Sequence, residues 1–371
     1  MTVKLLKSIF FSFVLVAMSV PSLQGQILLP EPKKECGTVV TAKQMRVELE
    51  RAEMGFYTPL APQLNRPYQI PLTIHIVRKT DGTDGFTLNK LQIAMQDLNR
   101  LWLPLGMQFY QHGAVDYINN DFFFNLPDSQ IARDNLRQTN PMANTLNVYF
   151  TNVTGLCGQA SFTTEEFQGV LVDNGCAGLE SNPSTFAHEV AHYFDLYHTH
   201  ETSFGVECPS GSNCSTTGDL LCDTSADPDL NQDTNVTAAC VWTGAAAAPM
   251  GCDMTAYAPS TRNIMSNSRK TCRDVFTGNQ NSKALNILTT VANRTNLINT
   301  LTKYIAPDGG LNSNCTYQTP CRTLSRAIEV ANPGNTIFLL SGSYPGGVPP
   351  INKAVVLKKW NTDAGVVTVG Q

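Results

Sequence analysis

The sequence predicts an α+β fold followed by a small β-rich segment at the C-terminal end. Three observations support this prediction. Apolar residues alternate around residue 70 as in a strand, and they recur at helical spacing after residue 88. Residues 303–371 contain short β-type runs between Gly, Pro and Asn turns. With 371 residues, the chain has room for a large core and for more than one domain.

The first elements follow from apolar periodicity. Residues 26–65 are polar and rich in proline, and we expect a leader there with one helix at 42–54. Alternation predicts a strand at 68–78, through Ile70, Leu72, Ile74 and Ile76. A helix at 89–103 would bury one face, formed by Leu91, Met95, Leu98 and Trp102.

The middle of the chain supplies the remaining large elements. Two further strands are predicted, at 146–153 and 169–173. Pro183 and Ser184 are expected to begin a helix, because proline is tolerated in a first turn and serine can cap it. Residues 199–273 contain few apolar runs, so disulfides and a bound cation are expected to stabilise them. Helical periodicity returns at 282–301.

The character of the chain changes near Lys303, where we expect a second, small domain. It begins with an amphipathic helix formed by Leu324, Ala327, Ile328 and Ala331. Short strands are predicted at 336–340, 355–357 and 366–369.

The N-terminus is typical of a secretory signal peptide. A basic start precedes an apolar run from Ile9 to Val20, and we expect cleavage after Gly25. That run is too short to span a bilayer comfortably, and no later segment could cross one. The net charge of -4 argues against nucleic acid or an anionic membrane as the main partner. We therefore expect a secreted, soluble protein.

Eleven cysteines in an exported chain imply disulfides, and the odd number leaves at least one unpaired. They form groups along the chain: Cys36 alone, Cys157 with Cys176, six between Cys208 and Cys272, and Cys315 with Cys321. Pairing within the groups would leave Cys36 as the free thiol. The connectivity within the six stays open.

Residues 188–198 carry a zinc-binding pattern. His188 and His192 are four residues apart, so on a helix both imidazoles can reach one metal ion. Glu189 is placed to hold a water on that ion, and His198 can return as a third ligand after a turn. Three protein ligands with an open fourth position describe a catalytic zinc site.

The alternative is a chance match, because a bare HExxH occurs on many ordinary helices. Four of the six histidines fall within 188–200, and this clustering favours the zinc site. We interpret His200 as a bystander and His75, inside an apolar run, as a core or strand residue.

The residues from His188 onward resemble the metzincin metallopeptidases, and within them the pappalysin family. Beyond the zinc motif, the match includes Tyr197-His198-Thr199-His200, Gly218-Asp219, Cys222-Asp223-Thr224, Asn263-Ile264-Met265 and Phe276-Thr277. It covers residues 66–300. The resemblance implies a twisted, mostly parallel sheet with an active-site helix in a domain at 66–302.

The resemblance also implies roles. His188, His192 and His198 would bind Zn²⁺, Glu189 would be general base and then general acid, and Met265 would lie beneath the metal as an apolar floor. Gly169, Val170, Leu171 and Val172 would form the sheet-edge strand that pairs with an extended substrate. Asp219, Asp223 and Asp227 could contribute to a Ca²⁺ site, and the alternative is that they cap turns.

Cys36 lies in Glu35-Cys36-Gly37-Thr38, which resembles the family's pro-segment motif. There a thiolate occupies the open zinc position and keeps the enzyme latent until the leader is cleaved. The alternative is a structural disulfide, and the odd cysteine count favours latency. The pro-segment would then span 26–65, with Arg51 and Arg66 as candidate activation sites.

Two positions depart from the family pattern. Asp195 stands where the family often has glycine at the sharp turn before the third histidine, and Asp tolerates left-handed backbone better than most residues. Asn267 stands where many metzincins have a tyrosine that supports the transition state. Catalysis could therefore be slower, or another residue could stabilise the oxyanion.

Residues 303–371 resemble the start of a right-handed parallel β-helix, as in secreted carbohydrate-associated proteins. The match rests on Thr319–Ile328, Pro333–Leu340 and Gly342-Ser343-Tyr344. Such coils bury their core by stacking, and normally three or more are needed. This segment could lean on the peptidase domain or offer an edge to a glycan or surface partner.

The sequence therefore predicts a secreted zinc endopeptidase that acts on protein or peptide substrates. One alternative is a catalytically weak or inactive metzincin-fold protein that binds a surface or glycan through its C-terminal segment. A weaker alternative is a zinc amidase that acts on a non-peptide amide.

Overall fold

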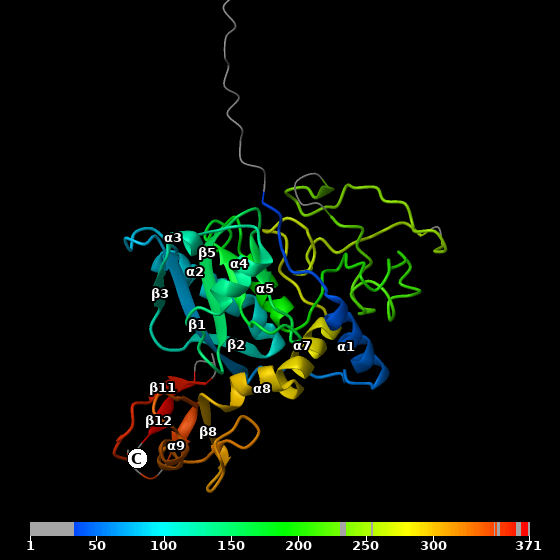
Figure 1. Cartoon of the computed structure of the whole chain (residues 1–371). Coiled ribbons are helices and arrows are strands. Elements are labelled where there is room, and N and C mark those ends of the chain that lie inside the picture. The colour runs from blue at the N-terminus through cyan, green and yellow to red at the C-terminus, as the bar shows by residue number, and fades with distance from the viewer. Residues whose placement is uncertain are drawn as a thin grey trace, which may run out of the picture. The chain divides into compact units, whose positions relative to one another are not determined.

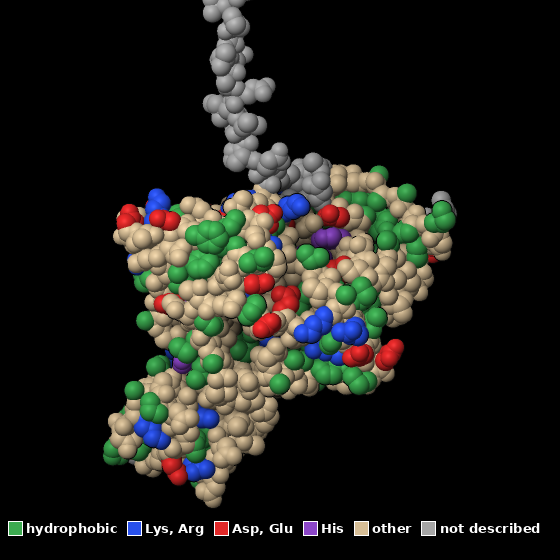
Figure 2. All heavy atoms as spheres, in the orientation of Figure 1, with side chains coloured by type: hydrophobic (Ala, Val, Ile, Leu, Met, Phe, Trp, Pro, Cys, Tyr) green, Lys and Arg blue, Asp and Glu red, His purple; other side chains and the backbone are tan. Residues whose placement is uncertain are grey.

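A computed structural model describes residues 33–230, 235–253, 255–344, 346, 349–360 and 365–369. Residues 33–371 form one compact unit (Figure 1). The predicted signal peptide at 1–25 lies outside the described residues. No helix in the described part is long and apolar enough to cross a membrane. The face drawn in Figure 2 carries acidic and basic side chains side by side, consistent with the small net charge.

The main sheet has seven strands and is mostly parallel, as predicted. Its central order is β2-β1-β5-β7-β6, while β3 pairs with β1 and β4 pairs with β5. Only β6 runs antiparallel to its neighbour. The strands are β1 (Tyr68–Arg78), β2 (Met107–Gln111), β3 (Asp116–Asn119), β4 (Asn125–Leu126), β5 (Leu146–Val153), β6 (Gly158–Ala160) and β7 (Val170–Asp173).

Helices cover both faces of this sheet. One face packs against α2 (Leu88–Trp102), α5 (Thr185–Tyr193), α7 (Gly278–Thr290) and α8 (Ala292–Asn299). The other packs against α3 (Asp121–Phe124) and α4 (Gln130–Arg137). Nine of the eleven residues of β1 are buried, as expected for a strand in the middle of a three-layer fold. A short 3-10 helix, η1 (Leu103–Leu105), links α2 to β2.

Three predictions about these elements are wrong. The strand predicted at 169–173 is β7, which lies between β5 and β6, so Gly169, Val170, Leu171 and Val172 do not form the sheet edge. The helix predicted at 282–301 is two helices, because Val291 adopts an extended backbone between α7 and α8. Ser184 stands at the N-cap of α5, but its side chain makes no capping bond.

The leader contains α1 (Ala42–Glu53), which packs beside α7 (Figure 1). Three of its side chains are buried: Gln44, Glu48 and Arg51. Glu48 forms a buried ion pair with Lys283 of α7, and Gln44 Nε2 donates to Tyr197 Oη at 2.9 Å. The helix predicted at 42–54 is therefore confirmed, and it contacts the segment that leads to the third histidine.

The C-terminal residues build two small sheets, separate from the main sheet, around a hydrophobic cluster of their own. One has three parallel strands in the order β11 (Val356–Lys359), β9 (Thr336–Leu339) and β8 (Thr302–Gly310). In the other, β10 (Gly342–Tyr344) pairs with β12 (Val367–Val369). Helix α9 (Leu324–Val330) lies between β8 and β9 in sequence. The strands predicted at 336–340, 355–357 and 366–369 correspond to β9, β11 and β12.

An aromatic cluster joins this segment to the main sheet. Tyr110 of β2 packs with Tyr304, Phe338 and Trp360, all three in the C-terminal segment. Trp360 Nε1 donates to Pro67 O at 2.9 Å. These contacts show that the C-terminal segment shares a core with the beginning of β1 and with β2.

Candidate metal centre

Helix α5 carries the first two histidines and Glu189, and all nine of its residues are buried. The side chain of Asn182 caps the helix in place of Ser184, because its Oδ1 accepts from Thr185 N at 3.3 Å and from Thr185 Oγ1 at 2.8 Å. Ser184 Oγ instead donates to Lys270 O at 2.8 Å. The helix is thereby fastened at its start to the segment that follows Met265.

The chain turns sharply after α5 at Asp195. Its φ of 57° is left-handed, so the turn expected at this position is present without glycine. The Asp195 carboxylate accepts from Thr163 N at 2.8 Å and from Arg51 Nη1 of α1 at 2.7 Å. These bonds hold the turn that brings His198 back to the helix.

The three histidines meet at their Nε2 atoms. His192 Nε2 lies 3.1 Å from His188 Nε2 and 3.1 Å from His198 Nε2. Two nitrogens bound to one tetrahedral zinc would lie roughly 3.3 Å apart. His188 Nδ1 contacts Ile264 O and His192 Nδ1 contacts Leu196 O, each at 2.8 Å. Donation from Nδ1 leaves the Nε2 lone pairs to point at a shared centre.

The charge state of the histidines also fits a metal. Burial, first of all, lowers the pKa of His188, His192 and His198 well below the ordinary histidine value. All three are therefore neutral at neutral pH and can donate lone pairs. Together with Cys36 they form the one group of at least three metal-ligating side chains in the described part of the chain, with ligand atoms within 4.8 Å of one another.

Glu189 lies directly beneath the edge strand β6. A Cβ at Gly158 would come within 2.7 Å of Glu189 Oε1, so this position accommodates only glycine without a shift. Glu189 Oε1 is buried and has no hydrogen-bond partner among the described residues. Burial raises the pKa of Glu189 well above the ordinary value. A buried carboxylate with a free oxygen beside a metal centre is suited to take and return a proton.

The segment around Met265 supports two of the histidines. Met265 is completely buried, and Thr199 N donates to Met265 O at 3.1 Å, next to His198. The preceding carbonyl, Ile264 O, is the partner of His188 Nδ1. The backbone of Ile264 and Met265 thus contacts His188 and the residue after His198, and the position of the Met265 side chain beneath the metal stays a prediction.

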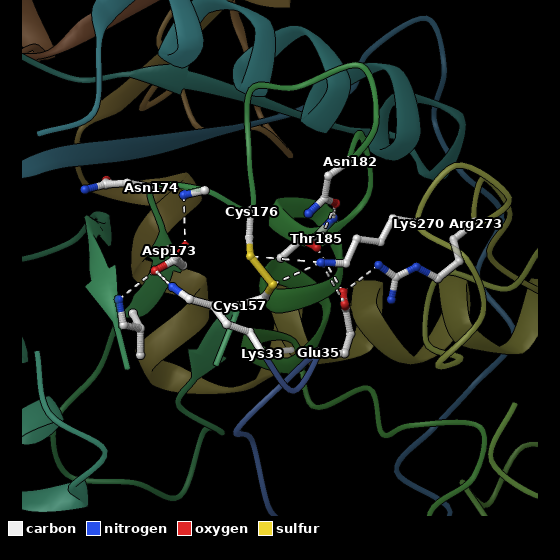
Figure 3. Close-up of a disulfide and its surroundings, with 12 residues drawn as sticks. Lys33, Glu35, Cys157, Asp173, Asn174, Cys176, Asn182, Thr185, Lys270 and Arg273 are labelled. Carbon is white, nitrogen blue, oxygen red and sulfur yellow. Dashed lines mark hydrogen bonds and ion pairs between the residues drawn. A yellow bond between two sulfur atoms is a disulfide. The ribbon is translucent and has the colours of Figure 1, made fainter. Parts of the chain in front are cut away.

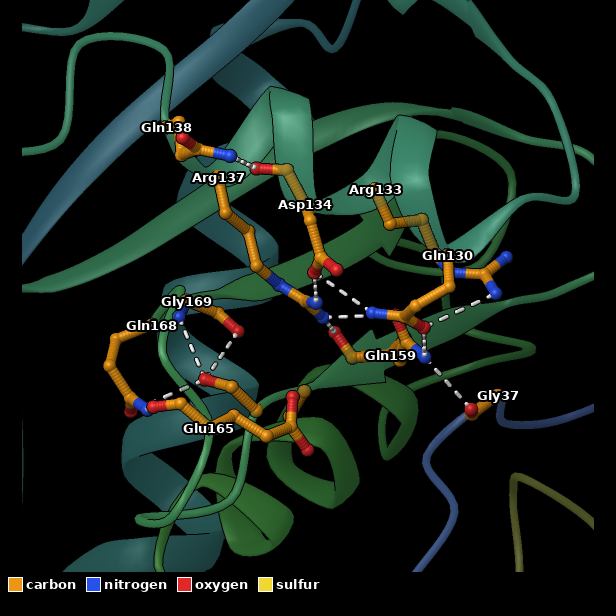
Figure 4. Close-up of polar contacts among 12 residues, drawn as sticks. Gly37, Gln130, Arg133, Asp134, Arg137, Gln138, Gln159, Glu165, Gln168 and Gly169 are labelled. Atoms are coloured by element: carbon orange, nitrogen blue, oxygen red, sulfur yellow. Dashed lines mark hydrogen bonds and ion pairs between the residues drawn. The ribbon is translucent and has the colours of Figure 1, made fainter. Parts of the chain in front are cut away.

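The leader enters the site along the edge of β6. Lys34 N donates to Gly155 O at 2.8 Å, and Gly37 N donates to Gly158 O at 2.9 Å. Figure 4 shows Gly37 beside Gln159, whose Nε2 donates to Gly37 O at 3.0 Å. Cys36 Sγ lies 3.5 Å from Glu189 Oε2, and burial raises the pKa of this thiol well above its ordinary value. The leader therefore bonds along the edge of the sheet at β6 and at the residues just before it.

Cys36 is the free thiol that the cysteine count predicts. The other ten cysteines pair within their groups, as 157–176, 208–252, 214–222, 240–272 and 315–321. Three of these bridges lie within residues 208–272, in the stretch with few apolar residues. The prediction that disulfides hold that stretch is confirmed.

Other predicted residues have individual partners. His75 is buried in β1 with its ring nitrogens on Asp116 and Asn147, as expected of a strand residue. His200 stacks on His198 but lies outside the ligand group. Asn267 Nδ2 donates to Asp229 Oδ1 at 2.7 Å.

The three aspartates suggested for calcium lie in different environments. Asp223 accepts from Thr277 Oγ1 and Asn279 N at the start of α7, and Asp227 accepts from Thr199 Oγ1 and Asp229 N. Asp219 is buried, and its Oδ2 has no hydrogen-bond partner among the described residues. The other oxygen of Asp219, Oδ1, accepts from Leu221 N at 3.0 Å and from Thr224 Oγ1 at 2.9 Å. All three aspartates therefore have the turn-capping contacts of the alternative.

Sequence reasoning missed the edge strand β6 and the partners of Glu35. Strand β6 has only three residues, Gly158-Gln159-Ala160, which carry no alternating pattern. Arg273 and Lys270 bind Glu35 across more than two hundred residues of sequence. The one available signal was the position of Glu35 directly before Cys36.

A mostly parallel sheet with a buried helix, three converging histidines and a neighbouring glutamate defines the architecture of a metallopeptidase. The sequence relatives belong to the same general class. The chain is 29% identical over 225 residues to an extracellular metalloprotease of Colletotrichum graminicola, a match that covers 57% of this chain and 74% of the relative. It is 23% identical over 294 residues to an extracellular metalloprotease of Neurospora crassa, covering 73% and 94%.

Among solved structures, the chain resembles mature mirolysin of Tannerella forsythia in complex with a cleaved peptide, with a TM-score of 0.46 and 18% sequence identity. The match covers 62% of this chain and 95% of that chain. This likeness is too weak to add to the argument. No protein-family model matches the chain. The chain is thus a homologue of extracellular metalloproteases, which implies a metal cofactor, usually zinc.

Proposed function

We propose that the chain is a secreted zinc endopeptidase of the pappalysin family, kept latent by Cys36 of its leader. One observation carries the proposal: three neutral imidazoles converge at 3.1 Å beside the buried Glu189, directly beneath the edge of the sheet. The motif from His188 to His198 and the segment around Met265 support the family. The signal-peptide pattern and the five disulfides support secretion.

His188, His192 and His198 would hold the zinc. When bound, zinc supplies Lewis acidity and lowers the pKa of a water to about 7. Glu189 would accept a proton from the attacking water and deliver it to the leaving amine nitrogen. The carbonyls of Ile264 and Leu196 fix the imidazole rings, so the ligands need no rearrangement during the reaction.

We assign substrate binding to β6 in place of β7. The leader already bonds to the backbone of residues 155–158 as an added strand, and an extended peptide can use the same donors and acceptors.

The leader would inhibit by occupying both the metal and the sheet edge. Cys36 Sγ lies with the three Nε2 atoms in one ligand group, so a thiolate there would complete a closed four-ligand set. Burial alone favours the neutral thiol, whereas a bound cation favours the thiolate. Latency therefore depends on metal and leader together.

Chelation tests this function. The secreted full chain, activated by limited trypsin treatment, is expected to cleave a denatured protein mixture and to lose that activity with a zinc chelator. Activity should return when zinc is added back. Mass spectrometry of the products gives the cut sites. Cleavage that continues unchanged after complete metal removal would contradict the proposal, and products without new peptide termini would favour an amidase.

We also propose a calcium site, centred on Asp219 and extended by Glu207. Both side chains are buried, and each has one oxygen, Asp219 Oδ2 and Glu207 Oε1, without a hydrogen-bond partner among the described residues. Burial raises the pKa of both carboxyls to about 7. A divalent cation would compensate both charges and leave the carboxyls ionised. No observation favours a glycan partner for the C-terminal segment, which stays a prediction from sequence.

The pH dependence of stability tests the calcium site. Because the folded pKa values of Asp219 and Glu207 are raised, these groups favour the folded state at low pH, and that contribution is lost as the pH rises through about 7. Calcium should therefore raise the Tm by roughly 5 °C at about pH 8 and by much less at about pH 5. Asp219→Asn should abolish this difference, whereas Asp223→Asn should keep it. Equal Tm values with and without calcium at both pH values would contradict the site.

A further inference from the structure

A buried carboxylate of the leader, Glu35, lies beside two cationic side chains, Lys270 and Arg273 (Figure 3). It directly precedes Cys36 of the metal-ligand group. Glu35 is 7% exposed, and its Oε1 accepts from Arg273 Nη2 at 2.5 Å and from Thr185 Oγ1 at 2.9 Å. Lys270 Nζ lies 3.2 Å from the other oxygen, Oε2. Among the described residues, neither Arg273 nor Lys270 forms an ion pair with any other carboxylate. Among the described residues, Glu35 is therefore the one carboxylate that pairs with both cations.

Residues outside the leader hold Arg273 and Lys270 in place, and the leader contributes only Glu35 to this site. Arg273 Nε donates to Ser184 Oγ and Arg273 Nη1 donates to Ser266 O, both at 3.1 Å. Lys270 Nζ lies 3.0 Å from Cys157 Sγ, against the Cys157–Cys176 disulfide (Figure 3). Ser184, Ser266 and the disulfide belong to segments that surround α5. We therefore expect the two cations to keep their positions when the leader leaves.

Glu35 lies one residue from the proposed zinc position. Glu35 directly precedes Cys36, which lies in the ligand group of the three histidines. The leader runs parallel to the segment before β6, with Lys34 opposite Leu156 and Gly37 bonded to Gly158. A substrate paired antiparallel, the more stable arrangement, would run the other way along the same edge. The residue just after its scissile bond would then reach the place of Glu35.

We propose that Arg273 and Lys270 form a subsite for a carboxylate. The enzyme would then cleave peptide bonds in which the residue just after the cleaved bond is Asp or Glu. The inference rests on the proposed peptidase function and specifies its substrate class. An acidic side chain would replace Glu35 as the partner of both cations, whereas a neutral one would leave Arg273 buried without a charge partner. A lysine or arginine at this position would add like-charge repulsion. A free C-terminal carboxylate has the same chemistry and is a second source.

Cleavage of matched peptides tests the preference. Peptides that have Glu, Gln or Lys directly after one cleaved bond and are otherwise identical are incubated with the trypsin-activated full chain. Each peptide is prepared as the C-terminal amide and as the free acid. We expect kcat/KM for Glu to exceed that for Gln by about tenfold or more, with Lys lowest. Equal preference for Glu in amidated and free-acid peptides assigns the site to an acidic side chain. A gain confined to the free acid, where the carboxylate is the chain terminus, would instead assign it to that terminus.

Substitution of Lys270 connects the preference to the site. Lys270 lies at the rim, with a 19% exposed side chain, so Lys270→Met is expected to fold, whereas loss of Arg273 would also break its bonds to Ser184 and Ser266. Lys270→Met should remove most of the preference for Glu over Gln, and Lys270→Glu should favour Lys. Lys79→Met, at an exposed ion pair with Asp84, is the matched control and should leave the preference unchanged.

Binding separates failure of this inference from failure of the proposed function. Peptides of residues 33–41 with Cys36→Ser, carrying either Glu35 or Glu35→Gln, are titrated calorimetrically into activated Glu189→Ala protein. The Glu35 peptide should bind about tenfold more tightly, and Lys270→Met should erase the difference. If this difference holds without any cleavage of peptides, the peptidase assignment fails and the subsite stands. Cleavage without an acidic preference, together with equal binding of both peptides, would overturn the subsite alone.

Discussion

Glu189→Ala is expected to lower peptide hydrolysis by at least about a thousandfold while zinc content and folding stay unchanged. The reason is that Glu189 is a buried carboxylate directly after the ligand His188, and its Oε1 has no hydrogen-bond partner among the described residues. In the processed enzyme, which lacks Cys36 and Thr38 of the leader, loss of Glu189 removes the proton carrier and takes no side-chain hydrogen-bond partner from another described residue. The measurement is kcat/KM on a quenched peptide, with metal analysis and thermal unfolding on the same sample.

The exposed Glu180 provides the matched control, and Glu180→Ala should retain normal activity. A Glu189→Ala protein that binds zinc, folds and still cleaves at the normal rate would show that another group accepts the proton. A variant that loses zinc would instead indicate that the glutamate supports the ligand set.

Removal of the Cys36 thiol is expected to raise the activity of the uncleaved precursor by at least about tenfold. Cys36→Ala deletes the proposed fourth ligand, while the backbone bonds of Lys34 and Gly37 and the ion pairs of Glu35 still hold the leader at the sheet edge. Activation should therefore be partial. Adding Glu35→Ala should bring the uncleaved chain closer to the rate of the processed enzyme, because it removes the second anchor.

Thiol alkylation provides an independent measurement of the same contact. In the zinc-loaded precursor Cys36 should react slowly, and a chelator should make it react faster, since the other ten cysteines are paired in disulfides. Alkylation at one rate with and without zinc would contradict metal ligation by Cys36. A wild-type precursor as active as its Cys36→Ala form would exclude latency through this residue.

The metal centre could be predicted from sequence because its spacing is local. His188 and His192 share a helix face by periodicity alone, and the left-handed Asp195 makes the short turn to His198. The sheet was predictable for the same reason, since β1 and β5 are long apolar strands. Cys36 could be singled out by counting, because the other ten cysteines pair within their sequence groups.

The edges and long-range pairs could not be predicted. Strand β6 is three small or polar residues long, and its edge position is a property of the strand order, which no local pattern records. The sequence predicted β7 as the edge strand because no pattern in the sequence indicated β6, which lies outside it. The pairing of Glu35 with Arg273 spans 238 residues and needs the folded chain.

The aromatic joint between Tyr110 and Trp360 bears on how this protein can be rearranged. A C-terminal domain connected by a flexible linker can be exchanged between enzymes. Here, however, β2 and the C-terminal segment contribute side chains to one buried cluster. Cutting the chain near residue 302 would uncover Tyr110 and leave Pro67 O without its indole partner, at the very start of β1. Recombination or engineering that replaces the C-terminal segment must therefore also replace the residues of β2 and of the start of β1 that it contacts.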